Sequence, residues 1–247
     1  MRRYISGQKS FEKEGKIMER AIIEYVKRSQ EDDPDDHSKY KMYLKKMERI
    51  DLSQFTEQDA EIILKPFLYK WGGMGRTLGQ KRCSGWESDI VKQIHSNSDQ
   101  LGNFRAINFV STNLMDFKKD IIKCYESFKT IVDRVAATKT LHIICPNFFP
   151  LWDNNIANAV RSELIKIVAE TNKIELISMI LEKIDNFSGK DYYRFMLVTQ
   201  DFIERYKNTF LDLGKTYEKS VVKILDDFLW MTAHRPLSLF LQKSGTM

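Results

Sequence analysis

Apolar residues recur along this chain at intervals of three and four positions, with polar residues between them. From Asn113 to Arg134, for example, Leu114, Phe117, Ile121 and Phe128 fall on one side of a helix, the pattern of an amphipathic helix packed on a core. No segment alternates apolar and polar residues long enough to predict a strand. The pattern therefore predicts an all-α protein, a multi-helix globular domain with about nine to ten helices.

Other stretches repeat this periodicity between turn-forming residues. We expect helices at about residues 10–28, 38–49, 56–69, 84–95, 156–169, 174–184, 191–210 and 215–231. The helices at 56 and 84 each begin with the spacing of a capping box. The acidic run 31–37 predicts a solvated break, because its carboxylates lack the order of a cation-binding loop. The tail from residue 234 is expected to dock as a strap.

The chain is expected to form a single all-helical domain over residues 1–247. An alternative division has two helical lobes that flank a cleft, one at about residues 40–135 and one at 136–247 together with the N-terminal helix. Within the last helix, Asp226 and Asp227 are adjacent, so their side chains should diverge by about 100° and not form a paired acid site. One of them could reach a basic partner such as Arg76 or Lys139.

One stretch, residues 138–160, combines reactive groups with a well-defined backbone. Thr138 is expected to cap a helix that begins at Lys139, and Pro146 ends this helix. Asp153 is then well placed as the N-cap of the next helix. An amine and a carboxylate would each lie at the start of a helix. The simpler interpretation is that Asp153 is only a cap and Lys139 only a solvated lysine.

Aromatic residues fill the loop between these two positions, and a histidine follows Lys139 by one helical turn. Phe148, Phe149 and Trp152 are either core residues or the walls of a pocket for a planar ring. His142 is either a hydrogen-bonded wall residue or a group that moves protons. Periodicity alone does not separate these alternatives.

This segment resembles the catalytic segment of the helix-hairpin-helix DNA glycosylase superfamily: a Lys-Thr-aliphatic helix, a proline-bearing loop, an aspartate, and a helix with spaced Ile156 and Val160. The resemblance implies a DNA glycosylase-like fold in which Lys139 is the Schiff-base lysine and Asp153 the essential aspartate. The loop between them is several residues shorter than in that superfamily. The Leu-Pro-Gly-Val-Gly hairpin that holds a DNA phosphate there is replaced by residues 131–137.

A second segment, residues 62–86, is basic, contains no acidic residue and holds five of the eleven glycines. Backbone N–H groups in a glycine-rich turn can cradle an anion, and an arginine can close on it. The expected phosphate contacts are Lys70, Gly72, Gly73, Gly75, Arg76, Lys81 and Arg82. The alternative is an interhelical loop with ordinary surface charges. Trp71, Phe148 and Trp152 are the residues expected to stack on an extruded base.

Composition restricts the class of protein. The net charge of +5 over 247 residues permits contact with nucleic acid without requiring it. No apolar run approaches the roughly 18 residues of a membrane span. The three cysteines fit reduced thiols in a cytoplasmic protein and exclude a four-cysteine iron–sulfur cluster. The four histidines lack metal-ligand spacing, so we expect neither a metal nor a cofactor.

The leading hypothesis is a DNA glycosylase-like base-excision protein, with Schiff-base lyase activity as a further expectation. Its catalytic candidates are Lys139, Asp153 and His142, and its expected partner is DNA. One alternative is a non-catalytic nucleic-acid-binding module that uses the cations of residues 62–86 and a basic face on the 38–49 helix. Another is a helical interaction or scaffold protein without chemistry.

Overall fold

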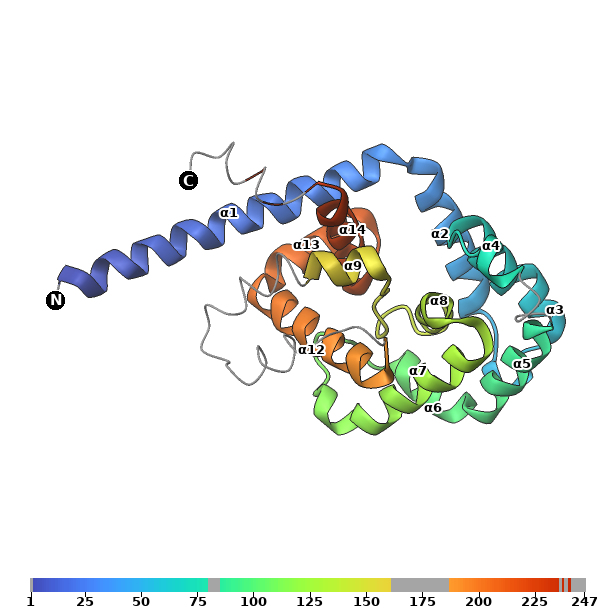
Figure 1. Ribbon diagram of the computed structural model, residues 1–247. Coiled ribbons are helices and arrows are strands. Elements are labelled where there is room, and N and C mark those ends of the chain that lie inside the picture. The colour runs from blue at the N-terminus through green and yellow to red at the C-terminus, as the bar shows by residue number, and fades with distance from the viewer. Residues whose placement is uncertain (1, 80–84, 161–186, 236, 238–239, 241–247) are drawn as a thin grey trace.

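The computed structural model describes residues 2–79, 85–160, 187–235, 237 and 240, and these residues are all-helical, without strands (Figure 1). The α-helices are α1 (Arg2–Asp32), α2 (Pro34–Glu48), α3 (Glu57–Asp59), α4 (Gly75–Leu78), α5 (Trp86–Ser96), α6 (Ser98–Ala106), α7 (Lys118–Val132), α8 (Arg134–Ile144), α9 (Asn154–Ala159), α12 (Gly189–Arg205), α13 (Lys207–Tyr217) and α14 (Val221–His234). The expected all-α class is confirmed. No helix among these residues has the length and apolar character needed to cross a bilayer.

The N-terminal helix α1 is longer than expected and runs along α14 and α13, with its first half extending beyond the other helices (Figure 1). The acidic stretch after it is not a loop but a sharp corner. Asp33 caps α2 by accepting a hydrogen bond from the Asp36 N–H, and Pro34 occupies the first position of α2. A proline there needs no N–H partner, so the chain can turn and start a new helix at once.

The segment after α2 is helical but irregular. The expected capping box between Thr56 and Asp59 is present, and the helix that it opens continues through two π-helical turns, η2 (Ala60–Leu64) and η3 (Phe67–Trp71). Two short 3-10 turns, η1 (Leu52–Gln54) and η5 (Leu114–Phe117), precede α3 and α7. The N-cap of α5 is Gly85, at a φ of 79°, while the expected cap Ser84 lies outside the described residues.

Helices α7 and α8 form a tight hairpin joined at Asp133. This residue has a φ of 121°, and its carboxylate accepts hydrogen bonds from the N–H groups of Val135 and Ala136. The prediction that Thr138 caps a helix starting at Lys139 is therefore wrong. Thr138 lies one turn inside α8, where its hydroxyl bonds the Val135 and Trp152 carbonyls. The helix dipole acts most strongly within the first turn of a helix. Lys139 lies beyond the first turn of α8, so the dipole has little effect on its amine.

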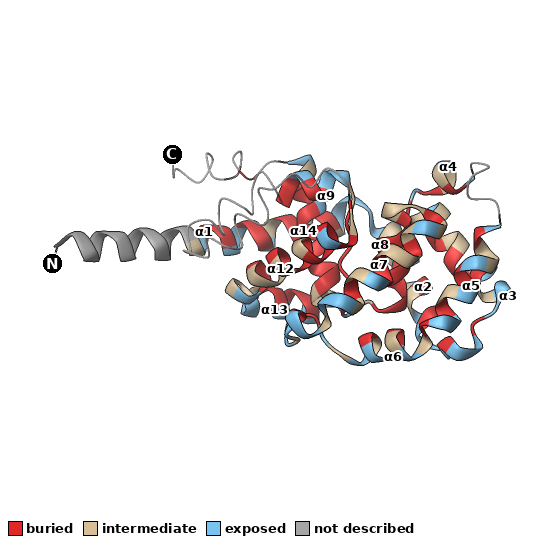
Figure 2. Ribbon diagram, turned by 60° about the horizontal axis from the view of Figure 1, so that its bottom comes forward, coloured by how far each residue is buried: buried red, intermediate tan, exposed pale blue. Residues whose placement is uncertain are grey.

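The C-terminal part contains three helices where two were expected, because the chain breaks at Tyr206 and at Glu218, which has a φ of 52°. The helices expected at 156–169 and 174–184 lie outside the described residues, except for α9. Buried apolar residues from α1 to α14 form one continuous core, and Figure 2 shows where buried residues lie along these helices. From the tail, Leu237 is buried and Phe240 packs partly against that core.

Candidate functional site

A cavity of about 310 Å³ lies where the α1–α2 corner, the loop between α8 and α9, and α14 meet. Its wall is unusually rich in charge, with six aspartates and two lysines, and it also contains three tryptophans. Only Trp71 comes from the 40–135 lobe of the alternative domain division. The other lining residues come from residues 29–37, 139–156 and 223–230.

Lys139 and Asp153, which the sequence singled out as an amine and a carboxylate, both line this cavity. Asp153 is the N-cap of α9 and accepts a hydrogen bond from the Ile156 N–H at 2.9 Å. The Lys139 Nζ donates to the backbone oxygen of Gly72 at 2.5 Å. Among the described residues, no ion pair within 4.0 Å joins Lys139 to Asp153. The two groups thus share one space without neutralising each other directly.

Burial controls the protonation of the Lys139 amine. Desolvation disfavours the ammonium form and lowers the pKa of Lys139 below its ordinary value. Lys223 acts in the same direction, while Asp153, Asp226 and Asp36 oppose it by attraction. A lower pKa increases the fraction of neutral amine, which is the form that attacks a carbon centre.

Three indole rings contribute to the wall, with different exposure. Trp152 is only 1% exposed, and its Nε1 has no hydrogen-bond partner among the described residues. Trp71 stacks on Phe67 with ring centroids 4.7 Å apart. Its indole Nε1 is buried and has no hydrogen-bond partner among the described residues. Trp230 is 44% exposed, so it presents a ring to solvent at the cavity.

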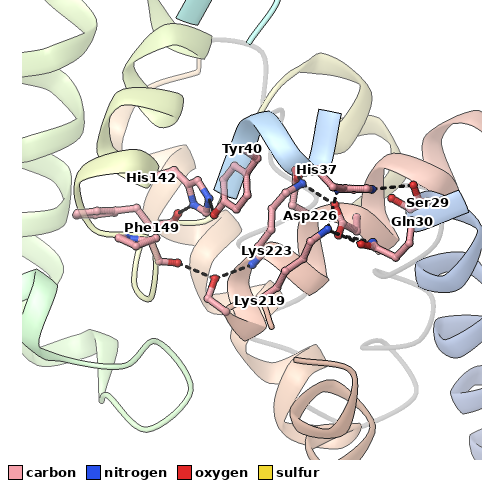
Figure 3. A network of polar contacts seen from close by, with 12 residues as sticks. Ser29, Gln30, His37, Tyr40, His142, Phe149, Lys219, Lys223 and Asp226 are labelled. Carbon is pink, nitrogen blue, oxygen red and sulfur yellow. Dashed lines mark hydrogen bonds and ion pairs between the residues drawn. The ribbon is translucent and has the colours of Figure 1, made fainter. Parts of the chain in front are cut away.

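Two residues expected at the site lie away from the cavity. His142 is fully buried, with Nδ1 2.8 Å from the Phe149 oxygen and Nε2 2.8 Å from the Tyr40 hydroxyl (Figure 3). A carbonyl only accepts, so Nδ1 carries the proton and the tyrosine donates to Nε2. Phe148 is also fully buried and stacks on Phe104 at 4.6 Å. Neither side chain lines the cavity, so the expected proton transfer by His142 and base stacking by Phe148 do not fit their positions.

The described part of the glycine-rich segment contacts the site through the hydrogen bond between Gly72 and Lys139 and through Trp71. The Gly72 carbonyl holds Lys139, Gly73 has a φ of 66°, and Gly75 begins α4. Lys70 and Arg76 are exposed. Lys81 and Arg82 lie outside the described residues. Of the described residues of this segment, only Trp71 lines the cavity, and Gly72 is linked to it through the hydrogen bond that its carbonyl accepts from Lys139.

A buried ion network, which was not expected from the sequence, underlies the cavity floor. The Lys223 Nζ lies 2.5 Å from the nearest carboxylate oxygens of both Asp226 and Asp227. Lys219 reaches Asp227 at 2.7 Å and Gln30 at 2.6 Å (Figure 3). The two aspartates diverge on the helix as expected, but one lysine, three and four positions earlier, reaches both. This i, i+3 and i, i+4 spacing was the signal in the sequence.

The network does not remove the surplus of acidic groups around the cavity. Asp32 and Asp33 are exposed at the α1–α2 corner, and Asp36 is partly buried. Burial raises the pKa of Asp36, against an opposing attraction from Lys223. Among the residues that the structure describes, no group of three or more His, Cys, Asp or Glu side chains is arranged to hold a metal ion. The cavity is therefore negatively charged and suits neutral or positively charged groups.

The two cysteines within the described residues, Cys124 and Cys145, are buried free thiols, and neither lines the cavity. Comparisons of the chain with protein families, with curated proteins and with solved structures gave no match.

Proposed function

We propose that this protein is a base-excision-type enzyme that cleaves an N-glycosidic bond, with Lys139 as nucleophile and Asp153 as the stabilising carboxylate. The observation that carries the proposal is that both groups line one cavity without forming an ion pair. The volume of about 310 Å³ lies at the small end of the roughly 300–1,000 Å³ of ligand pockets. That space suits one extruded nucleotide.

The charge of the cavity matches the chemistry. When the bond between C1′ and the base nitrogen breaks, its electron pair leaves with the base and positive charge develops on the sugar. Preorganised negative groups stabilise that charge most where water is excluded. Asp153 is one such group, and the other acidic side chains of the wall reinforce it.

The Lys139 nitrogen then supplies the electron pair for a new bond to C1′. One of its protons passes to the departing base, and the other passes to the ring oxygen when the C1′–O4′ bond breaks. Opening of the sugar ring gives a Schiff base, the intermediate that underlies lyase activity. The lowered pKa of Lys139 supports this role, because burial increases the share of neutral amine. Trp71 and Trp230 are better placed than Phe148 to stack on a base.

Phosphate groups of a nucleic acid would have to lie outside the acidic cavity. Lys70 and Arg76 are exposed and flank Trp71 in the chain, so they are the proposed phosphate contacts. DNA remains the proposed partner on this basis. Charge repulsion at the acidic corner of α1 and α2 restricts the approach to the side of the glycine-rich segment.

Borohydride trapping tests this function. Oligonucleotides that each carry a single damaged base or an abasic site are incubated with the protein and then reduced, and covalent adducts are counted by gel and mass spectrometry. We expect an adduct with at least one lesion, on Lys139, that is lost in Lys139→Gln and retained in the control Lys207→Gln, an exposed lysine of α13 away from the cavity. Salt-sensitive binding without an adduct would instead support a non-catalytic nucleic-acid module.

A second candidate is a non-catalytic pocket for a small organic cation, favoured by the six aspartates and the exposed indole of Trp230. Calorimetric titration with 1-methylnicotinamide and with nicotinamide separates charge from shape, since the two rings differ mainly in charge. Preference for the cation, together with no trapped adduct on any lesion, would favour this alternative.

A further inference from the structure

Lys223 is fixed more firmly than any exposed lysine could be. It is 3% exposed, and its Nζ lies 2.5 Å from a carboxylate oxygen of Asp226 and of Asp227. Asp227 is held from its other side by Lys219, which also contacts the His37 ring nitrogen at 2.7 Å (Figure 3). The ammonium of Lys223 therefore has one position, set by groups on α14 and on the α1–α2 corner.

The same ammonium contacts the aromatic ring that Lys139 contacts. The Lys223 Nζ lies 5.4 Å from the Trp71 ring centroid, and the Lys139 Nζ lies 5.9 Å from it. Both distances fall within the range of cation–π attraction, about 6 Å. Trp71 itself is held in place by its stacking on Phe67. The ammonium of Lys223, which is paired with two aspartates, and the amine of Lys139 therefore both lie near the ring of Trp71.

The two lysines differ in the charged groups that surround their amines. Attraction by Asp226 and Asp227 overcomes burial and raises the pKa of Lys223, so it stays charged. The charged groups that face Lys139 are Asp153 from the α8–α9 loop, Asp36 from α2, and Asp226 and Lys223 from α14. Its hydrogen bond goes to a neutral carbonyl. Repulsion from a nearby fixed cation is a known means of keeping a lysine unprotonated.

We propose that Lys223 is a positioning residue whose fixed positive charge, held against the ring of Trp71, favours the neutral amine of Lys139. The value of a neutral Lys139 amine for catalysis rests on the proposed function. The effect of Lys223 on the protonation of Lys139 does not. It is measurable on the free protein without substrate.

Competitive labelling with trace acetic anhydride over a series of pH values, with mass spectrometry of the peptide that contains Lys139, measures where this amine loses its proton. We expect Lys223→Met to move the half-labelling pH of Lys139 upward. We expect Asp226→Asn to move it downward, since Asp226 attracts the ammonium and Asp227 still holds Lys223. Lys219→Met is the matched control: an equally buried lysine of the same network, expected to leave the midpoint near the wild-type value.

The opposite signs separate this role from a structural one. If Lys223 and Asp226 only held the core together, both variants would admit water to Lys139 and move its midpoint upward. An upward shift in Asp226→Asn, or an unchanged midpoint in a folded Lys223→Met, overturns the proposal. Lys223→Gln, which also removes the charge but keeps a polar group beside both aspartates, takes its place if Lys223→Met does not fold. Failure of the trapping experiment with damaged DNA would overturn the proposed enzyme and leave this result intact.

Discussion

The Lys139 Nζ donates a hydrogen bond of 2.5 Å to the backbone oxygen of Gly72, 67 residues earlier in the chain. Gly72 is closely surrounded: a Cβ added to it would lie 3.1 Å from the Lys139 Cδ and 2.8 Å from the Leu68 oxygen. Gly72 has ordinary helical dihedral angles. A glycine is therefore required here for space and not for backbone conformation.

Substituting Gly72 tests this packing. Gly72→Ala should lower the free energy of unfolding by about 1–3 kcal/mol, because a methyl group has no room beside a backbone oxygen. It should also displace the Lys139 amine and so reduce trapping. Gly102→Ala in α6 is the control: nothing lies within 4 Å of its added Cβ, so it should be neutral or stabilise by about 0.5–1 kcal/mol. Equal stability of the two variants in urea titration would refute the prediction.

Asp153 combines a structural and a proposed chemical role, and two substitutions separate them. Asp153→Ala should cost about 1 kcal/mol in urea unfolding, since the Ile156 N–H loses its cap. Asp153→Asn keeps a good capping residue and should be nearly as stable as the wild type. Removal of its negative charge should nevertheless abolish excision. An active, stable Asp153→Asn variant would show that Asp153 is only a cap.

The His142 ring predicts a specific dependence of stability on pH. Burial lowers its pKa from 6.5 to about 4, so between these values the unfolded chain binds a proton that the folded protein does not. The free energy of unfolding should therefore fall as the pH falls from 6.5 to about 4, with a contribution of about 3 kcal/mol from this residue. Urea midpoints measured across this window should show the fall. His142→Gln should have a shallower dependence, and parallel curves would contradict a neutral buried histidine.

The helical class and the N-cap at Asp153 could be predicted from the sequence because both depend on local signals. Apolar residues three and four apart indicate helices, and an aspartate after Pro150 indicates a cap. The start of α8 was predicted wrongly because two good caps compete nearby. Asp133 prevails over Thr138 since it adopts a φ of 121°, which a sequence does not reveal.

The rest of the site depends on contacts between distant segments. Nothing local to Gly72 indicates that its carbonyl meets a lysine of α8. His142 and Phe148 are residue types common in functional sites. In the structure, however, His142 is hydrogen-bonded to the Tyr40 hydroxyl and Phe148 is stacked on Phe104, and both are buried. Periodicity assigns residues to a face of a helix and does not say whether that face meets a core or a cavity.

The cavity wall draws on residues 29–37, Trp71, and residues 139–156 and 223–230, which lie far apart in the sequence. On the ribosome, the pocket can close only after the last long helix has emerged, so shortened products will lack it altogether. Any small molecule that fills it will contact segments that are far apart in the sequence and hold them together. Such a molecule should raise the melting temperature, so occupancy can be found without knowing the reaction.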